Sequence, residues 1–380
     1  MAMSAAVFAK AEDAARYQVG AYYFPGYHAD PRIVAAHGPG WTEWELVKRA
    51  EARFAGQAQP KRPLWGYEDE SDAAVFARKI AAAAEHGLSH FLFDWYWYEG
   101  APFLHRCLEN GYLKAENKQR LKFALMWANH DWLDIQPAKR SSPPALLHPG
   151  AVTSAVFDQM TDYVVRTYFT EPTYWKIGGA PYFSIYELFR FIDGMGGIEA
   201  ATAALARFRE KTKAAGLPDL HLNAVTWGIK SVPDVRALGF DSVTSYVWIH
   251  HVRLPEFPVT PYSYAAAEAS KYWREADTAY GLPFHPNVTM GWDSRPRACQ
   301  SDVFADTGYP FMSTLGGNTP RAFRSALTQV KQFLDARPAQ PRILNINAWN
   351  EWTEGSYLEP DTTHGFEYLR AIRDVFGQER

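Results

Sequence analysis

The sequence predicts an α/β fold, a single (β/α)8 barrel with long loops after its strands. Three observations support this prediction. Short β-branched or aromatic runs alternate with amphipathic segments along the chain, which implies parallel strands joined by crossover helices. There are about eight of each, the number that closes such a barrel. An open doubly wound sheet is the alternative, but Phe24, Pro25, Gly26 and Tyr27 follow the first strand where a glycine-rich phosphate loop would stand.

The eight expected strands share short apolar runs that stop at Gly, Pro or polar clusters. They are residues 17–24, 90–97, 121–128, 181–187, 220–226, 241–248, 287–291 and 343–349. The expected helices are 69–87, a helical start at 104–110, then 151–168, 198–215, 232–238, 264–280, 320–334 and 366–376. In the first of them, Ser71 or Asp72 can cap the start and Gly87 the end. Since no segment has the composition of a linker, we expect one catalytic domain over residues 1–380.

Composition limits the classes of partner. A net charge of −3 and a pI of about 6.5 point away from nucleic acid and from anionic membrane surfaces. Cys107 and Cys299 are far apart, which favours a reducing compartment over a disulfide or a metal site. Without a recognisable signal peptide we expect a cytoplasmic protein, or a periplasmic or secreted one if a signal has been removed. No HExxH, cysteine cluster or GxSxG motif occurs, so we expect neither a metal nor another cofactor.

Aromatic residues make up 15% of the chain, with 14 Trp, 21 Tyr and 23 Phe. A large core could account for them, but many stand where strands are expected to end. Carbohydrate clefts use such rings as flat platforms with polar edges. The aromatic content therefore favours a carbohydrate ligand.

The densest polar cluster follows the last expected strand. There Glu351 and Glu354 stand three residues apart, beside Asn350 and Trp352, and Gly355 can turn the chain. Charged residues are rarely buried without a partner or a task. Carboxylates beside indole rings are a recurring way to separate the pKa values of an acid and a base. We therefore predict that Glu351 and Glu354 are the catalytic pair.

In a barrel, the substrate lies at the carboxyl ends of the strands. Almost every expected end, together with the long first loop, carries an aromatic ring and a hydrogen-bonding group. The candidate substrate-binding residues are Tyr22, Tyr23, Trp44, Asp94, Trp95, Tyr96, Trp127, Asn129, Trp227, Tyr246, Trp292, Asp293, Arg295 and Asn350. Structural roles remain open for several: Asp94 could cap a helix, Trp44 could plug the barrel, and Asp293 could pair with Arg295.

Five stretches together resemble a known family. They are Ala21-Tyr22-Tyr23-Phe24-Pro25, Gly40-Trp41-Thr42-Glu43-Trp44, Phe93-Asp94-Trp95-Tyr96-Trp97, Gly291-Trp292-Asp293 and the run from Ala348 to Gly355, which contains an NEWxEG motif, with Leu358-Glu359-Pro360 after it. This pattern resembles glycoside hydrolase family 99 and the related bacterial chains labelled WbsX.

The resemblance implies a (β/α)8 barrel that acts on glycosidic bonds with retention. Glu351 would take the proton of the sugar 2-hydroxyl, which attacks its own anomeric carbon to give a 1,2-anhydro sugar. Glu354 would protonate the leaving oxygen and then activate water. Thr353 stands where the mannosidases of that family have His, so mannose specificity is not carried over. A glycosyltransferase of surface polysaccharide (O-antigen) synthesis and a non-catalytic carbohydrate-binding barrel are the alternative functions.

Overall fold

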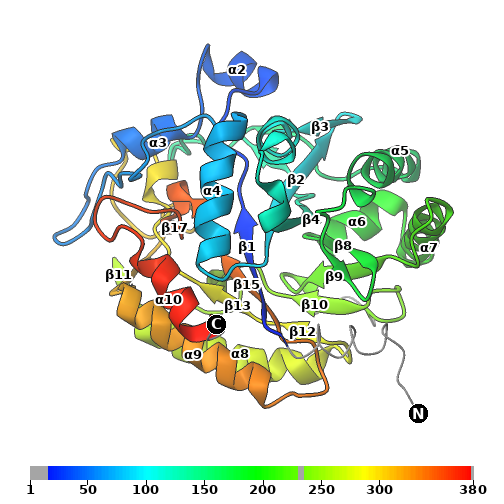
Figure 1. The fold of residues 1–380 in the computed structure, drawn as a ribbon. Coiled ribbons are helices and arrows are strands. Elements are labelled where there is room, and N and C mark those ends of the chain that lie inside the picture. Colours follow the sequence, from blue (N-terminus) through cyan, green and yellow to red (C-terminus); the bar gives the residue numbers. More distant parts are fainter. Residues whose placement is uncertain (1–15, 230–234, 378–380) are drawn as a thin grey trace.

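The computed structural model describes residues 16–229 and 235–377 and shows a parallel barrel surrounded by helices (Figure 1). Its strands are β1 (Gln18–Tyr23), β2 (His90–Tyr98), β4 (Lys122–Trp127), β8 (Ala180–Ile185), β9 (His221–Val225), β10 (Ser242–Thr244), β12 (Phe284–His285), β13 (Asn287–Thr289) and β15 (Ile343–Asn347). Neighbours in the sheet run in the order β12, β10, β9, β8, β4, β2, β1, β15, β13.

Pro286 divides the seventh strand into β12 and β13. The first half pairs with β10 and the second with β15, so this one position joins the two ends of the sheet. Proline removes one backbone donor at the division, and its carbonyl still accepts a hydrogen bond from Asn345 N at 3.0 Å. Eight strand positions therefore close a ring, and the predicted barrel is confirmed.

Most of the expected helices are present. They are α4 (Ala73–Glu85), the short helical turns η1 (Cys107–Gly111) and η2 (Tyr112–Lys114), α5 (Ser154–Val164) continued by η4 (Val165–Phe169), α7 (Ile198–Ala214), α8 (Tyr262–Ala279), α9 (Pro320–Asp335) and α10 (Glu367–Phe376). Asp72 caps α4, since its side chain accepts from Ala74 N. Of the expected helix at 232–238, residues 232–234 lie outside the described part of the chain and the rest forms turns.

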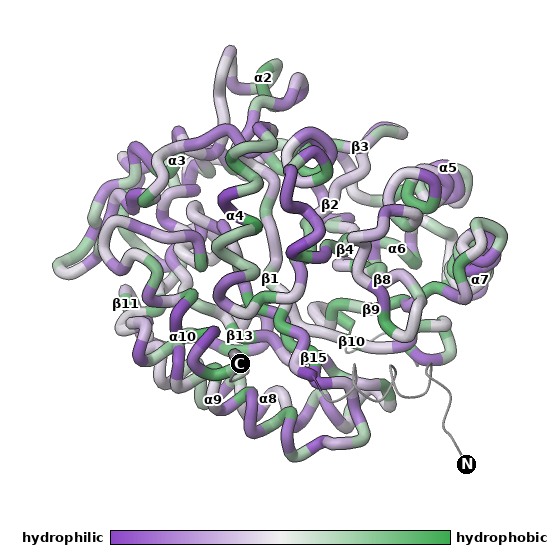
Figure 2. The backbone as a smooth tube through the Cα atoms, viewed as in Figure 1, coloured by the Kyte–Doolittle hydropathy of each residue, from purple (hydrophilic) through white to green (hydrophobic). Residues whose placement is uncertain are grey.

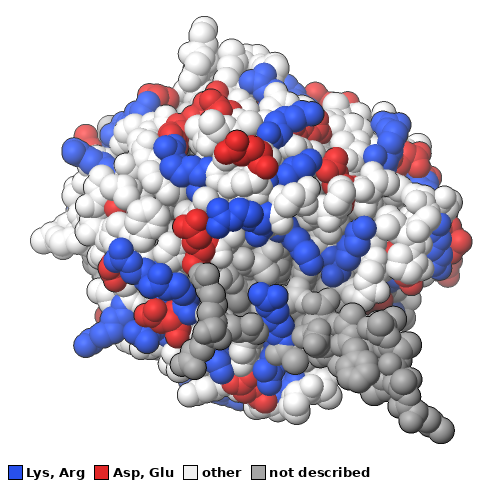
Figure 3. Space-filling model, in the orientation of Figure 1, with Lys and Arg blue, Asp and Glu red and all other residues white. Residues whose placement is uncertain are grey.

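The helices present one apolar face to the barrel. In α9 the large buried side chains are Phe323, Leu327, Val330 and Leu334, which are three or four residues apart, as one helical face requires, and Ala326 is buried beside them. Hydrophobic and hydrophilic residues alternate along the outer helices in Figure 2, and α9 packs against both α8 and α10 in Figure 1. No helix in the described ranges has the length and apolarity needed to cross a membrane. On the face shown in Figure 3, Lys and Arg are interspersed with Asp and Glu.

The long loops contain more structure than the sequence indicated. The first loop holds α2 (Pro31–His37) and α3 (Trp44–Arg49), and α6 (Leu188–Met195) follows β8. Short strand pairs brace the other loops: β2 with β3 (Ala101–Phe103), β5 (Trp132–Leu133) with β6 (Leu146–His148), β7 (Lys176–Ile177) with β8, β11 (Val259–Pro261) with β14 (Thr314–Gly316), and β16 (Asn350–Glu351) with β17 (Ser356–Tyr357). Except for β7, which pairs with the first residues of β8, these segments follow barrel strands and therefore lie at their carboxyl ends.

Candidate active site

A cavity of about 780 Å³ opens at the carboxyl ends of the strands. This volume lies in the range of ligand-binding clefts. Its wall includes Asp94 and Tyr96 from β2, Tyr246 after β10, Trp292 after β13, and the pair Glu351 and Glu354. All eight strand positions contribute to the wall a residue that lies at the end of the strand or shortly after it. These residues are Phe24, Asp94, Met126, Tyr186, Trp227, Tyr246, Trp292 and Glu351.

A tight hairpin after β15 holds the two glutamates. Glu351 ends β16, which pairs with β17 through Asn350–Tyr357 and Glu351–Ser356, and Glu354 ends the turn η8 (Trp352–Glu354) between them. The turn needs Gly355, whose φ is 64° and whose missing Cβ would lie 2.9 Å from the backbone nitrogen of Asp293. The indole of Trp352 stacks on Tyr357 with ring centroids 3.7 Å apart. Both carboxylates are therefore fixed by backbone pairing and ring packing.

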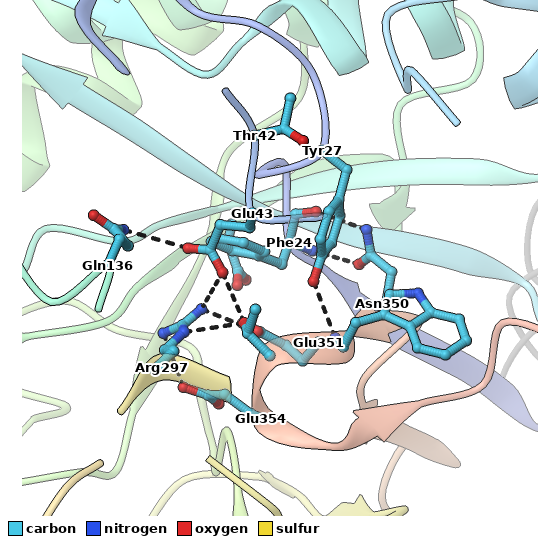
Figure 4. A network of polar contacts seen from close by, with 12 residues as sticks. Phe24, Tyr27, Thr42, Glu43, Gln136, Arg297, Asn350, Glu351 and Glu354 are labelled. Atoms are coloured by element: carbon cyan, nitrogen blue, oxygen red, sulfur yellow. Dashed lines mark hydrogen bonds and ion pairs between the residues drawn. The ribbon is translucent and has the colours of Figure 1, made fainter. Parts of the chain in front are cut away.

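One buried guanidinium joins three carboxylates at the cavity floor (Figure 4). Arg297, at the end of η7 (Arg295–Arg297), reaches Glu354 Oε1 at 3.0 Å, Glu43 Oε2 at 3.3 Å and Glu351 Oε2 at 3.4 Å. Its Nε donates to Thr353 Oγ1, and Thr353 donates to Glu43 Oε2 at 2.7 Å. The first, seventh and eighth loops are thus tied together through charge.

Both glutamates favour the protonated form more than an ordinary carboxyl does. Burial and repulsion from Glu354 raise the pKa of Glu351 well above its usual value. Burial also raises the pKa of Glu354, although Arg297 and the Tyr309 hydroxyl oppose the shift. Tyr309 donates to Glu354 Oε1 at 2.8 Å, the same oxygen that Arg297 contacts, so Oε2 can carry a proton. Two close carboxyls of raised pKa with one cation between them are equipped to share a proton as an acid and a base.

Of the predicted substrate-binding residues, five line the cavity: Asp94, Tyr96, Trp227, Tyr246 and Trp292. Trp227 keeps 37% of its surface exposed and stacks on Tyr186, with ring centroids 5.8 Å apart. An exposed indole braced from behind can take the C–H face of a sugar.

Several others lie outside the cavity wall, in the packing of the barrel. Trp95 donates to the Tyr168 hydroxyl, and Trp127 packs against Phe157 of α5 and Phe191 of α6, so both indoles point toward the helices. Side chains alternate sides along a strand, which places Asp94 and Tyr96 on the cavity side and Trp95 on the other.

Four more are taken up by hydrogen bonds to the backbone of other segments. Tyr22 donates to Ser245 O, Trp44 donates to Glu68 O, and the Asn129 amide exchanges two hydrogen bonds with the Glu187 backbone. Asn350 likewise exchanges two with the Phe24 backbone.

A second buried ion cluster lies beside the hairpin formed by β16, η8 and β17. Tyr23 belongs to this cluster. Lys79 of α4 reaches Glu70 at 2.7 Å, Glu359 at 2.9 Å and the Tyr23 hydroxyl at 3.2 Å. Glu359 in turn accepts from the Trp352 indole at 2.8 Å. This cluster therefore supports the hairpin that carries Glu351 and Glu354.

The two remaining predicted residues, Asp293 and Arg295, lie in the seventh loop, and their side chains contact other groups instead of pairing with each other. Asp293 accepts from Gln57 and Gln59, both at 2.9 Å. Arg295 donates to Met312 O and lies over the Phe304 ring at 4.1 Å. Each holds a loop segment, and neither lines the cavity.

Sequence reasoning did not include Arg297, Glu43 or Tyr309 in the site. Nothing in the sequence tells that Arg297 points inward while Arg295 braces a loop, because both stand in one irregular turn. Glu43 belongs to the resembling Gly40–Trp44 stretch, so that stretch could have indicated it. Tyr309 lies in a long loop whose path depends on tertiary contacts.

Comparisons with known proteins agree with this architecture. The family described as "Glycosyltransferase WbsX" matches residues 19–372. A relative from two strains of Xanthomonas campestris pv. campestris, described as "Uncharacterized protein WxcX", is 29% identical in an alignment of 372 positions that covers 93% of this chain and 49% of the relative. The chain thus spans about half the length of these relatives.

Solved structures share the fold at low sequence identity. A glycoside hydrolase-like protein superposes with a TM-score of 0.61 at 15% identity, covering 96% of this chain and 95% of that one. The GH99 endo-alpha-mannosidase from Bacteroides thetaiotaomicron gives a TM-score of 0.58 at 14% identity, covering 94% and 96%. With the family match over nearly all of its length, the chain belongs to the family described as glycosyltransferase WbsX.

Proposed function

We propose that this protein is a retaining glycoside hydrolase that cleaves α-glycosidic bonds in an oligo- or polysaccharide. The observation that carries the proposal is the buried pair Glu351 and Glu354, which shares Arg297 at the floor of a cavity walled by aromatic rings. An acid and a base held beside the same substrate cleft are what glycoside hydrolysis requires. The fold shared with a GH99 endo-alpha-mannosidase supports the same reaction class.

The reaction would use the two glutamates in two steps. Glu351 accepts the proton of the sugar 2-hydroxyl as that oxygen attacks C1, and Glu354 gives its proton to the departing glycosidic oxygen. The product of this step is a 1,2-anhydro sugar. Glu354 then takes a proton from water as the water oxygen attacks C1, and Glu351 returns its proton to O2, which restores both carboxyls. Two inversions at C1 leave its configuration retained.

The charge of the cavity favours a glycan over a nucleotide-sugar. Its described wall carries six carboxyl groups, Asp94, Asp131, Glu187, Asp306, Glu351 and Glu354, against three guanidinium groups, Arg190, Arg253 and Arg297. Arg190 is already paired with Glu187 and Asp131, and Arg297 with the floor carboxylates. A diphosphate would meet mostly like charge here, whereas neutral hydroxyls can bond to every one of these groups.

A glycosyltransferase is the second candidate, favoured by the description of the family. In that case a sugar hydroxyl would replace water in the second step, and Glu354 would activate it. A non-catalytic carbohydrate-binding barrel is a third, which would keep the ring platform and lack turnover.

Product analysis separates the three. The purified protein is incubated with α-linked oligosaccharides and bacterial surface polysaccharides, without nucleotide or metal, beside Glu351→Gln and Glu354→Gln. Release of oligosaccharide by the parent and its loss in both variants supports the hydrolase. Sugar transfer only when a nucleotide-sugar or lipid-linked donor is added supports the transferase. Binding by Glu351→Gln without cleavage by the parent supports the binding protein.

A further inference from the structure

Asp94 is a buried carboxyl group at the cavity wall that forms no ion pair with a Lys or Arg in the described part of the chain. It is 3% exposed, and its Oδ2 lies 2.8 Å from the hydroxyl oxygen of Tyr246. Its other oxygen, Oδ1, has no hydrogen-bond partner among the described residues. Glu351, in contrast, has Arg297 at 3.4 Å. An uncompensated buried charge is costly, so Asp94 needs a different way to be accommodated.

The hydroxyl of Tyr246 stands between two carboxyl groups. Its oxygen lies 2.8 Å from Asp94 Oδ2 and 3.2 Å from Glu351 Oε1. A tyrosine hydroxyl has one proton to donate, and burial together with Asp94 and Glu351 raises the pKa of Tyr246 well above its usual value, so it keeps that proton. If both carboxyls were charged, one of them would face the lone pairs of the hydroxyl oxygen.

The surroundings of Asp94 decide which carboxyl takes the proton. The groups that act on it are the Tyr246 hydroxyl, the carboxylate of Glu354 and the guanidinium of Arg297, with Tyr96 and Tyr22 also close enough to sense its charge. Arg297 contacts Glu43, Glu351 and Glu354 directly. Burial raises the pKa values of both Asp94 and Glu351 well above their usual values. What separates them is the contact with Arg297 at 3.4 Å, which favours the charged form of Glu351, whereas none of the ion pairs among the described residues involves Asp94.

We propose that Asp94 is a positioning residue that stays protonated, donates to Tyr246 Oη and thereby directs the Tyr246 proton onto Glu351. Three groups then form one chain, from the Asp94 carboxylic acid through the Tyr246 hydroxyl to the Glu351 carboxylate. The proposal rests on the proposed function for its purpose, since it keeps Glu351 charged as a base. A neutral Asp94 also removes one of the charges that raise the pKa of Glu351.

The protonation of Asp94 can be measured without any substrate. Infrared spectra at neutral pH are recorded on protein with unlabelled aspartate and on protein with aspartate carrying 13C in its side-chain carboxyl. The difference isolates the carbonyl band of a protonated aspartic acid. We expect this band in the parent protein, its loss in Asp94→Asn, and its retention in Glu351→Gln, which serves as the matched control. A parent without the band, or a band unchanged in Asp94→Asn, would overturn the proposal.

A second variant covers the case in which Asp94→Asn does not fold. Tyr246→Phe removes the acceptor, so the aspartic acid band should persist at a shifted frequency, and an unshifted band would contradict the chain. Where glycoside cleavage is detected, Asp94→Asn should keep the acidic limb of the kcat/KM profile, because its amide can still donate to Tyr246. Asp94→Leu should move that limb upward by about one pH unit, since Glu351 loses its oriented donor. Equal loss in both variants would contradict the proposal, while absence of cleavage would count only against the hydrolase.

Discussion

Arg297 and Glu354 are joined by a buried ion pair at 3.0 Å, formed between the seventh and eighth loops of the barrel. The same guanidinium also reaches Glu351 and Glu43. A single cation therefore compensates three carboxylates, which is why the pKa of Arg297 is raised well above its usual value in spite of burial. This contact both compensates charge on the hairpin that carries Glu351 and Glu354 and holds the hairpin against the seventh loop.

Replacing Arg297 by Met should cost about 3 to 5 kcal/mol in the free energy of unfolding, because it leaves buried carboxylates without a cation. Urea unfolding of the parent and the variant measures the change. The double variant Glu43→Gln/Arg297→Met should recover part of this stability without recovering glycoside cleavage. If Arg297→Met were as stable as the parent, the buried carboxylates would not need the charge of Arg297, which would contradict this account.

The ion cluster behind the hairpin makes a related prediction. Lys79→Met leaves Glu70 and Glu359 buried together and should destabilise the protein by about 3 to 5 kcal/mol. The triple variant Lys79→Met/Glu70→Gln/Glu359→Gln should regain much of that loss, since no buried charge remains. Equal stability of the single and triple variants in urea would contradict the account of this cluster.

Substitutions of Trp227 and Trp127 should have different effects, the first on substrate binding and the second on stability. Trp227→Ala removes an exposed ring of the cavity wall, so we expect KM to rise about tenfold with the free energy of unfolding within about 0.5 kcal/mol of the parent. Trp127→Ala removes a fully buried ring that does not line the cavity, and should cost about 3 to 5 kcal/mol in stability. Steady-state kinetics and urea unfolding on both variants check this. An unchanged KM in Trp227→Ala would remove the ring from the proposed substrate site.

Buried histidines near the amino-terminal end of the barrel should make the protein sensitive to acid. Burial lowers the pKa of His90 to about 3 and that of His221 to about 4, against about 6.5 in an unfolded chain. The unfolded state therefore binds more protons below pH 6.5, so this stability is complete above pH 6.5 and is lost as the pH falls toward the folded values. Between pH 6.5 and 5, His90 alone should cost about 2 kcal/mol.

Unfolding in urea at a series of pH values measures this dependence. His90→Gln should show a smaller loss of stability over the same interval than the parent. An identical pH dependence in the two proteins would show that His90 does not contribute.

The barrel could be predicted because its strands and most of its helices are set by local patterns. Ile343, Leu344 and Ile346 mark β15 as a buried strand, and α9 repeats its apolar residues on one face, so both were expected within a few residues of their ends. The split of the seventh strand at Pro286 and the helices α2, α3 and α6 were not, because they depend on contacts made by long loops.

The arrangement of the candidate site could be predicted in part for the same physical reason. The hairpin with Glu351 and Glu354 is contiguous in sequence, and the alternation of β2 could have separated Asp94 from Trp95. Arg297 and Tyr309 come from irregular segments and reach Glu354 only through the folded chain. Whether a ring such as Trp127 faces the cavity or a helix is decided by packing, which residue type alone does not reveal.

Cleavage in H2 18O tests the central claim most directly. The protein is incubated with an α-linked oligosaccharide or surface polysaccharide that it degrades, and the products are analysed by mass spectrometry and by NMR of the new anomeric centre. The account predicts one 18O atom at each new reducing end, initial α configuration, and no reaction by Glu351→Gln or Glu354→Gln. Products without 18O that form only with a nucleotide-sugar or lipid-linked donor, or cleavage that persists in both variants, would contradict it.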